Sequence, residues 1–333
     1  MRLLVTGGAG YVGSVVAAQL LEAGHEVVVL DDESTGHADG VPAGADYVRG
    51  TIRDDAANVL AEGIDAVLHF AAKSLVGESV AKPGLYWSHN LGGTLALLEA
   101  MRRTGVGSIV FSSTAAVYGE PERVPVEETD PARPTSPYGA SKLAVDETLH
   151  EYANLNGLAA VSLRYFNVAG AYRSAGDRWL SERHSPETHL IPNVLAIALA
   201  ASGDPAVAAS GKTELKIFGD DYPTPDGTCV RDYIHVADLA RAHLLALGAC
   251  TPGEHRVYNL GNGTGFSNRE VLTVCREVTG LDIPARTAPR RDGDPAVLVA
   301  SSAHIHQDLG WKAELDLRSM VADAWSAVCA AAG

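Results

Sequence analysis

Short apolar runs alternate with amphipathic stretches along the first half of the chain. Apolar runs bounded by turn signals are typical of strands buried in a parallel sheet, and longer stretches with a period of about 3.6 residues are typical of helices. The pattern predicts strands at residues 3–6, 26–30, 66–70, 108–111 and 159–163, and helices at residues 11–23, 85–103 and 137–156. Because strands and helices alternate, we expect an α/β fold with a Rossmann-type doubly wound parallel sheet.

The alternation becomes less regular after about Gly170. Pro, Gly, Ser and charged residues accumulate over residues 171–188. Beyond them the same criteria predict helices at residues 189–202 and 234–247 and a strand at residues 257–260. We therefore expect residues 1–169 to form the Rossmann domain, with residues 233–260 returning to it, and residues 170–333 to form a smaller C-terminal α/β domain.

Composition and charge narrow the classes of partner. Of the 333 residues, 46% are hydrophobic and 20% are charged, so the chain can bury a large core. The formal net charge of −15 argues against nucleic acid or anionic lipid as the main partner. No apolar run reaches the roughly 18 residues that suggest a membrane helix, and no basic segment precedes an apolar one at the start. We expect a cytoplasmic protein that binds neither nucleic acid nor membrane.

A glycine-rich loop follows the first predicted strand. The stretch T-G-G-A-G-Y-V-G ends that strand, opens the first predicted helix and places glycines at positions 8, 10 and 13. Glycines allow the backbone to approach a pyrophosphate closely, and the helix N-terminus supplies amide donors and partial positive charge. The strand–loop–helix order therefore predicts a dinucleotide-binding site.

An acidic residue at the end of the second predicted strand fits the same site. Asp31 lies about 20 residues beyond the loop, where a carboxylate binds the hydroxyls of the adenosine ribose. Asp32 and Glu33 follow directly, and no Arg or Lys is close in sequence. Consecutive acids would repel a 2′-phosphate, so the pattern favours NAD over NADP as the cofactor.

The stretch S-P-Y-G-A-S-K places a tyrosine and a lysine at the start of a predicted helix. Ser136 suits the N-cap and Pro137 the first helical position, so Tyr138 and Lys142 lie one turn apart on the same face. A phenol has a pKa of about 10, and an adjacent ammonium, the helix N-terminus and an oxidised nicotinamide would all lower it. The pair is therefore a candidate general base, Tyr138, with Lys142 as the residue that assists it.

Several motifs, in order along nearly the whole chain, resemble the extended short-chain dehydrogenase/reductases and, within them, the UDP-glucose 4-epimerase family. They are T-G-G-A-G-Y-V-G, F-S-S-T-A-A-V-Y-G (111–119), Y-G-A-S-K, L-R-Y-F-N (163–167), D-G-T-C-V-R-D-Y-I-H-V (226–236), Y-N-L-G-N-G-T-G (258–265) and R-R-D-G-D (290–294). The resemblance implies reversible oxidation of a UDP-sugar at C4 through a 4-keto intermediate. The cofactor would be tightly bound NAD, and UDP-galactose and UDP-glucose would be interconverted.

The resemblance also implies roles for individual residues. Thr114 would hydrogen-bond the sugar 4-hydroxyl, with Tyr138 as the base and Lys142 as its partner. The expected NAD contacts are Gly7, Gly10, Tyr11, Val12, Gly13, Asp31, Asp32, Ser34, Thr51, Ile52, Phe70, Ala71, Ala72, Asn90, Ser112, Tyr138, Lys142 and Tyr165. The expected substrate contacts are Thr114, Tyr138, Asn167, His189, Leu190, Lys216, Phe218, Arg231, Arg291, Asp294 and Leu298.

Four positions bear on the finer assignment. Related 4,6-dehydratases carry an Asp-Glu pair after the active-site Thr, where this chain has Ala115 and Ala116, so elimination of water is disfavoured. Thr51 stands where the family often has an adenine-contacting Asp. Leu298 would limit bulk at the sugar 2-substituent, and its intermediate size leaves N-acetylated sugars open.

Two alternatives remain open from the sequence. The chain could be a 4-epimerase of another UDP-sugar, such as UDP-N-acetylglucosamine, UDP-glucuronate or a UDP-pentose. It could also be a non-catalytic NAD-sensing protein, although such proteins usually lose the Tyr or the Lys. By resemblance we expect a homodimer, in which the helices at 85–103 and 137–156 pack as a four-helix bundle.

Sequence spacing predicts no metal site. The chain has 12 histidines, and His304 and His306 stand two residues apart. Two residues at this spacing on a helix point in different directions, and no neighbouring carboxylate or cysteine completes a ligand set in sequence.

Overall fold

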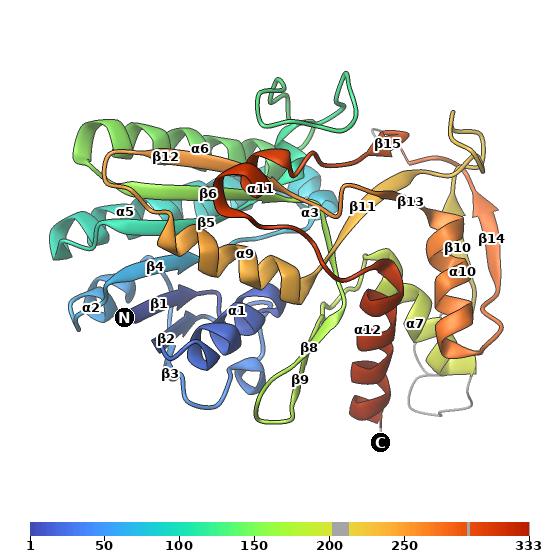
Figure 1. The fold of residues 1–333 in the computed structure, drawn as a ribbon, viewed down its shortest axis with the longest axis horizontal. Coiled ribbons are helices and arrows are strands. Elements are labelled where there is room, and N and C mark those ends of the chain that lie inside the picture. The colour runs from blue at the N-terminus through green and yellow to red at the C-terminus, as the bar shows by residue number, and fades with distance from the viewer. Residues whose placement is uncertain (202–212, 292–293, 333) are drawn as a thin grey trace.

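A parallel sheet forms the centre of the molecule (Figure 1). The computed structural model describes residues 1–201, 213–291 and 294–332. Within these ranges, seven strands pair in the order β12-β6-β5-β4-β1-β2-β3, all in parallel. Their bounds are β1 (Arg2–Thr6), β2 (Glu26–Asp31), β3 (Asp46–Arg49), β4 (Ala66–His69), β5 (Ser108–Thr114), β6 (Ala159–Tyr165) and β12 (His255–Leu260).

Helices cover both faces of this sheet, because its strands carry apolar side chains on both sides. One face packs against α1 (Tyr11–Glu22), α9 (Val236–Gly248) and α11 (Ala303–Leu309). The other packs against α2 (Ala56–Leu60), α5 (Gly93–Thr104) and α6 (Pro137–Asn156). Shorter helical segments lie between them: η1 (Ala38–Gly40), α3 (Val76–Ala81), α4 (Pro83–Tyr86), the π-helical η2 (Trp87–Gly92) and η3 (Ala115–Val117). The doubly wound Rossmann-type fold is thereby confirmed.

The second half of the chain adds a smaller α/β layer at one end of the sheet (Figure 1). Its core contains side chains of the helices α7 (Leu190–Ala201), α10 (Asn268–Thr279) and α12 (Leu317–Ala332). Its strands are short: β7 (Asn167–Ala169), β8 (Ala171–Arg173), β9 (Trp179–Ser181), β10 (Leu215–Phe218), β11 (Val230–His235), β13 (Gly265–Ser267), β14 (Ala285–Ala288) and β15 (Val297–Leu298). No helix within the described ranges is both long and apolar enough to span a bilayer.

The structure corrects the bounds of three predicted helices. The predicted helix 234–247 starts two residues later, because Ile234 pairs with Val168 in a sheet and His235 caps α9 by accepting from the backbone N–H of Ala237. The predicted helix 85–103 is not one regular α-helix, since η2 interrupts it. The predicted helix 189–202 is α7, and residue 202 lies outside the described residues.

Candidate active site

A cavity of about 610 Å³ lies at the carboxyl ends of the central strands. The residues that follow β1, β2, β4 and β5 line it, together with residues of α6. Strand order reverses beside β1: β2 and β3 lie on one side of it, and β4, β5, β6 and β12 lie on the other. In open α/β sheets, the crevice at such a switch point is where ligands bind.

The glycine loop is packed too closely for side chains. A Cβ on Gly13 would lie 2.3 Å from the carbonyl oxygen of Gly7, and a Cβ on Gly7 would lie 2.6 Å from the backbone nitrogen of Ala71. Gly7 also has a φ of +74°, which favours glycine. These contacts set the start of α1 against the ends of β1 and β4, so that the first turn of the helix lines the cavity.

The Asp31 carboxylate ties the end of β2 to the glycine loop. One oxygen accepts from the backbone N–H of Ala9 at 3.0 Å and the other from that of Glu33 at 2.8 Å. Burial raises the pKa of this carboxyl, while the hydrogen bonds from Glu33 and Ala9 act in the opposite direction. Asp32 and Ser34, which follow on the same loop, also line the cavity.

The first turn of α6 places Tyr138 at the cavity. Ser136 is the N-cap and accepts from the backbone N–H of Gly139 at 3.2 Å, and Pro137 occupies the first turn. Burial raises the pKa of Tyr138, whereas a hydrogen bond with the Thr114 side chain lowers it. Thr114 is the last residue of β5. The end of this strand and the start of α6 therefore bring the hydroxyls of Thr114 and Tyr138 together at the cavity.

Lys142 lies one turn further along α6 and is only 2% exposed. Its Nζ donates to the carbonyl oxygen of Ser112 at 2.7 Å and lies 4.7 Å from the centre of the Phe111 ring. Burial lowers the pKa of this ammonium to about 7, and the charge of Asp146 acts in the opposite direction. The Ser112 hydroxyl in turn contacts the Tyr165 hydroxyl. The lysine is therefore held by the backbone of β5, and no described interaction joins it directly to Tyr138.

Most of the residues expected at the site line this one cavity. The following line it: Gly7, Gly10, Tyr11, Val12, Gly13, Asp31, Asp32, Ser34, Thr51, Ile52, Phe70, Ala71, Ala72, Ser112, Thr114, Tyr138, Lys142, Tyr165, Asn167, His189 and Leu298. Thr51 donates its hydroxyl proton to Asp54 at 2.9 Å, and its backbone N–H to Asp55.

Asn90 does not line the cavity but lies behind its wall. It is 1% exposed, accepts from the backbone N–H of Lys73 and donates to the carbonyl oxygen of Lys73 and to the Ser141 hydroxyl. Asn90 thus fixes the backbone of Lys73, which itself lines the cavity.

The remaining six expected substrate contacts are also outside the cavity wall: Leu190, Lys216, Phe218, Arg231, Arg291 and Asp294. Arg231 forms an ion pair with Asp294, and the Arg291 guanidinium lies 4.0 Å from the centre of the Phe218 ring. Lys216 is an exposed residue of β10, and Leu190 begins α7. Arg231 is the strand partner of Leu298, which does line the cavity, so the β11–β15 pair leads from the cavity to these residues.

Sequence reasoning missed other residues of the cavity wall. They include Thr35, Gly36, Arg53, Lys73, Ser74, Ser88, His89, Phe166, Glu182 and His184. Lys73 and Ser74 directly follow two expected residues, so the rule that strand ends carry ligands could have found them. Glu182 and His184 come from the loop after β9, which had no strong strand signal.

The residues present fit a dinucleotide. The glycine loop leaves no space for a Cβ at Gly13, the N-terminus of α1 faces the cavity, and the carboxylate of Asp31 lies at the end of β2. Three features thus match the pyrophosphate and ribose of such a cofactor at their expected places. The fold and the cavity define a Rossmann-type enzyme that binds a dinucleotide.

Comparison with known proteins agrees with this class. Residues 3–261 match the model of the NAD dependent epimerase/dehydratase family. The UDP-glucose 4-epimerase of Corynebacterium glutamicum is 55% identical over 328 residues, which cover 98% of this chain and 95% of that protein. The UDP-glucose 4-epimerase of Streptomyces lividans is 58% identical over 329 residues, which cover 97% and 95%. The crystal structure of the UDP-glucose-4-epimerase from Stenotrophomonas maltophila, with bound NAD and formylated UDP-arabinopyranose, matches with a TM-score of 0.91 and 40% identity over 99% of this chain and 98% of that one.

The chain belongs to the NAD dependent epimerase/dehydratase family and, within it, to the UDP-glucose 4-epimerases. This confirms the resemblance seen in the sequence motifs. It also confirms NAD as the cofactor.

The buried position of Lys142 predicts a pH-dependent contribution to stability. In the unfolded chain its ammonium titrates near the ordinary value of 10.5, but in the fold near 7. The unfolded state therefore binds more protons between these values, and the free energy of unfolding rises with pH in that window. The free energy of unfolding of the wild type and of Lys142→Met can be measured by urea denaturation from pH 7 to pH 10. As the pH rises, the value for the wild type should increase relative to that of the variant by up to about 1.4 kcal/mol per pH unit.

The matched control is Lys312→Met, which removes an exposed lysine. The difference in free energy of unfolding between Lys312→Met and the wild type should be nearly independent of pH. A pH-independent difference for Lys142→Met as well would show that the lysine is not desolvated as described.

Proposed function

We propose that this chain interconverts UDP-galactose and UDP-glucose by reversible oxidation at C4 of the sugar, through a 4-keto intermediate, with tightly bound NAD. The observation that carries the proposal is the convergence of Tyr138, Thr114 and Lys142 on the cavity that the glycine loop and Asp31 also line. Bound NAD supplies an acceptor and donor of hydride. The other steps are assigned to side chains of this chain.

Tyr138 is the proposed base. Its phenolate takes the proton of the sugar 4-hydroxyl during oxidation. The hydroxyl that results returns this proton to the C4 oxygen once the keto sugar has turned and its opposite face is reduced. Thr114 interacts with Tyr138 and is placed to hydrogen-bond the same sugar oxygen. Burial raises the pKa of Tyr138, so its phenolate needs additional positive charge nearby. The oxidised nicotinamide ring and the partly charged Lys142 would provide this charge.

Lys142 and Tyr165 are proposed to hold the nicotinamide side of the cofactor. The Ser112 backbone accepts from the lysine and the Ser112 hydroxyl contacts Tyr165, so the three residues form one contact network. The glycine loop and Asp31 would hold the pyrophosphate and the adenosine ribose. Residues 1–169, with 233–260, thus form the proposed NAD-binding domain.

The UDP moiety is proposed to bind along the second half of the chain, residues 170–333. Arg231 and Arg291 would hold the diphosphate, where a planar guanidinium suits phosphate oxygens. Asp294 would bind the uridine ribose, and Phe218 and Leu190 would border the base. The β11–β15 strand pair supports this placement, because it connects Arg231 to Leu298 at the cavity wall.

The residues beside Thr114 support epimerisation over dehydration. Ala115 and Ala116 both line the cavity and carry no proton-transferring group. Eliminating water requires an acid and a base at the sugar, in addition to the hydride transfer. A second candidate function among the epimerases is use of another UDP-sugar, since Leu298 at the cavity wall is of intermediate size.

Incubating the purified protein with UDP-galactose, with no NAD added, tests the proposed activity. We expect UDP-glucose to form, because the bound NAD is regenerated in each cycle. Parallel reactions with UDP-N-acetylgalactosamine, UDP-glucuronate and UDP-arabinopyranose compare the alternative substrates by kcat/KM, measured by chromatography. Conversion of one of these at a higher kcat/KM would reassign the substrate, and no conversion at all by protein that contains NAD would favour an NAD-sensing role.

The substitution Tyr138→Phe tests the proposed base. It removes one hydroxyl from a half-buried ring and should lower kcat by about 10²–10⁴-fold, the range that a general base contributes. NAD content after acid extraction and the thermal midpoint should stay near the wild-type values. The matched control is Tyr172→Phe, whose hydroxyl contacts Glu22 away from the cavity. Turnover by Tyr138→Phe within a few-fold of the wild type would remove Tyr138 from the mechanism.

We also propose a homodimer formed by the helical face around α5 and α6. Several large apolar side chains are exposed on these helices and the segments beside them: Val76, Val80, Trp87, Leu95 and Leu155. Clustered exposed apolar residues mark interaction surfaces in soluble proteins.

The substitution Leu95→Glu tests this surface. A charge there would have to be buried in the dimer, so sedimentation velocity should show dissociation at concentrations at least about tenfold above those of the wild type. Leu245→Glu is a closely matched control, because Leu245 on α9 is 38% exposed and Leu95 is 39% exposed. Equal sedimentation of both variants and the wild type would exclude this face.

A further inference from the structure

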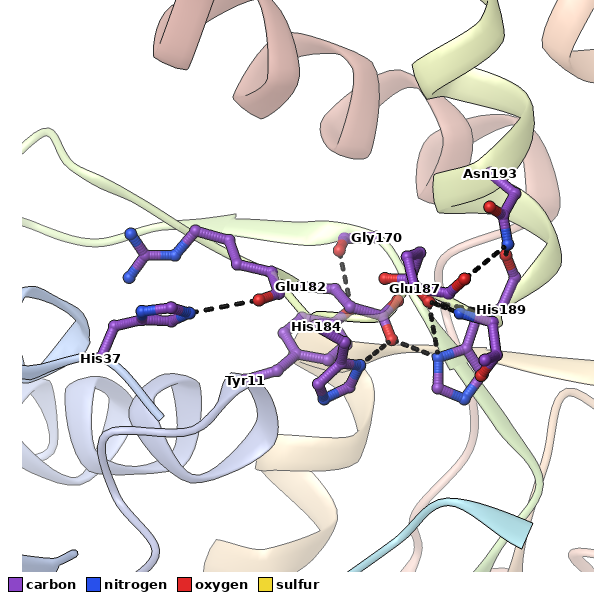
Figure 2. Close-up of polar contacts among 10 residues, drawn as sticks. Tyr11, His37, Gly170, Glu182, His184, Glu187, His189 and Asn193 are labelled. Atoms are coloured by element: carbon purple, nitrogen blue, oxygen red, sulfur yellow. Dashed lines mark hydrogen bonds and ion pairs between the residues drawn. The ribbon is translucent and has the colours of Figure 1, made fainter. Parts of the chain in front are cut away.

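Four potential metal ligands meet in the loop between β9 and α7 (Figure 2). Glu182 directly follows β9, and Glu187 and His189 precede α7, with His184 between them. Figure 2 shows the four side chains pointing toward one another, and one ligand atom from each lies within 4.8 Å of all the others. Two carboxylates and two imidazoles thus surround a common point.

The contacts among these side chains are compact. The Nδ1 atoms of His184 and His189 lie 2.9 and 2.5 Å from the same oxygen of Glu182, and His189 Nδ1 lies 3.3 Å from Glu187. In a tetrahedral zinc site with bonds of about 2.0–2.1 Å, ligand atoms lie about 3.3 Å apart. Side-chain rotations that move the ligand atoms by about 1 Å therefore suffice to admit an ion.

We propose that Glu182, His184, Glu187 and His189 form a binding site for one zinc ion in the wall of the active-site cavity. Nitrogen and carboxylate donors in a set of four suit zinc, whereas magnesium and calcium prefer oxygen ligands alone. Three of these residues, Glu182, His184 and His189, line the cavity. The ion would join the end of β9 to the start of α7 at the edge of that cavity.

Burial and charge support a divalent cation at this place. The side chain of Glu182 is 7% exposed and that of Glu187 is 16% exposed, so two carboxylates are withdrawn from most of the solvent. Burial, and after it the charges of Glu182 and Glu187, raise the pKa of Tyr11, which also lines the cavity. A divalent ion with two neutral imidazoles would balance both carboxylates.

Hydrogen bonds to nearby residues hold Glu187 and the backbone of His189 in place. Glu187 accepts from the backbone N–H groups of Thr188 and His189 at 2.7 and 2.8 Å, and Asn193 donates to the carbonyl oxygen of His189 at 2.7 Å. Contacts of this kind orient metal ligands and raise affinity. Sequence spacing did not reveal this set, because the E-x-H pairs at 182–184 and 187–189 meet only through the turn of the loop between them.

The test uses the full-length, untagged protein with its NAD retained. After treatment with EDTA and its removal, ZnCl2 is titrated by isothermal calorimetry, and the thermal midpoint is measured with and without zinc. We expect one zinc per chain, and a midpoint higher by about 5 °C at 100-fold the dissociation constant. MgCl2 should give no saturable binding at the same concentrations.

Two variants and one control assign the binding to this loop. His184→Gln and Glu187→Gln should each weaken zinc binding by more than the roughly 10–100-fold that losing a second-shell partner costs, and should abolish the zinc-dependent rise in midpoint. Glu187→Gln is the milder change, because its amide oxygen can still accept from the two backbone N–H groups. The control is His304→Gln, since His304 also lies beside carboxylates, Asp308 and Glu128, but outside the loop.

Binding that is lost in both loop variants and retained in His304→Gln establishes the site. Three results would overturn it, of which two concern binding. One is the absence of saturable zinc binding by the wild type, and the other is unchanged binding in both loop variants. Midpoints that fall in the variants by the same amount with and without zinc would likewise show that the cluster acts only as a network of ion pairs.

Discussion

The close backbone contact between Gly7 and Gly13 determines where the rest of the site lies. A single methyl group at Gly13 would lie 2.3 Å from the Gly7 carbonyl oxygen, so only glycine allows α1 to begin this near to the end of β1. The position of α1 then fixes Ala9, whose N–H is bound by Asp31 from the next strand. A wider loop would move the helix N-terminus away from the cavity and release the Asp31 carboxylate from it.

The opposite side of the cavity depends on strand β5 in a comparable way. Its last residues present Thr114 to the Tyr138 hydroxyl and the Ser112 carbonyl oxygen to Lys142. Ser136 fixes the start of α6 through its cap, so the tyrosine and the lysine are placed by one helix against one strand. Because β1 and β5 belong to the same parallel sheet, the glycine loop and the first turn of α6 lie at the same edge of that sheet and line one cavity. This explains how two motifs far apart in sequence serve one cavity.

The strands β1, β2, β4, β5 and β6 could be predicted from the sequence because they are largely buried. Strand β3 was not predicted, and its residues are exposed or half-buried. β1 is buried from Leu3 onward and has a continuous apolar run, and the predicted part of β6 is apolar except for the buried Ser162. The short strands β7, β8 and β9 could not be predicted, since runs of three residues carry no distinct period.

The residues of the candidate site were also easier to predict in the first half of the chain than in the second. Motifs on the first half named most of the cavity wall, because strand ends and a helix cap have fixed places in a doubly wound sheet. Arg231 and Asp294 were assigned separate roles by resemblance, but they form an ion pair whose two members come from strand β11 and the segment before β15. In the loop 182–189 the resemblance named only His189, and the cluster of four side chains gave no signal, since they meet through a turn rather than through helical or strand spacing. Tertiary contacts of this kind depend on loop geometry, which local sequence does not encode.

The ion pair of Arg231 is compatible with the diphosphate-binding role proposed for it. A guanidinium has five N–H donors, and the described contacts use one donor of Nη1 to the Val230 carbonyl oxygen and one of Nη2 to Asp294. The remaining donors can face a phosphate while Asp294 holds the side chain in one orientation. An arginine fixed in this way loses less conformational entropy on binding than a free one. A chain with a net charge of −15 can therefore bind an anionic nucleotide. The ion pair with Asp294 orients the Arg231 guanidinium and leaves some of its N–H donors available.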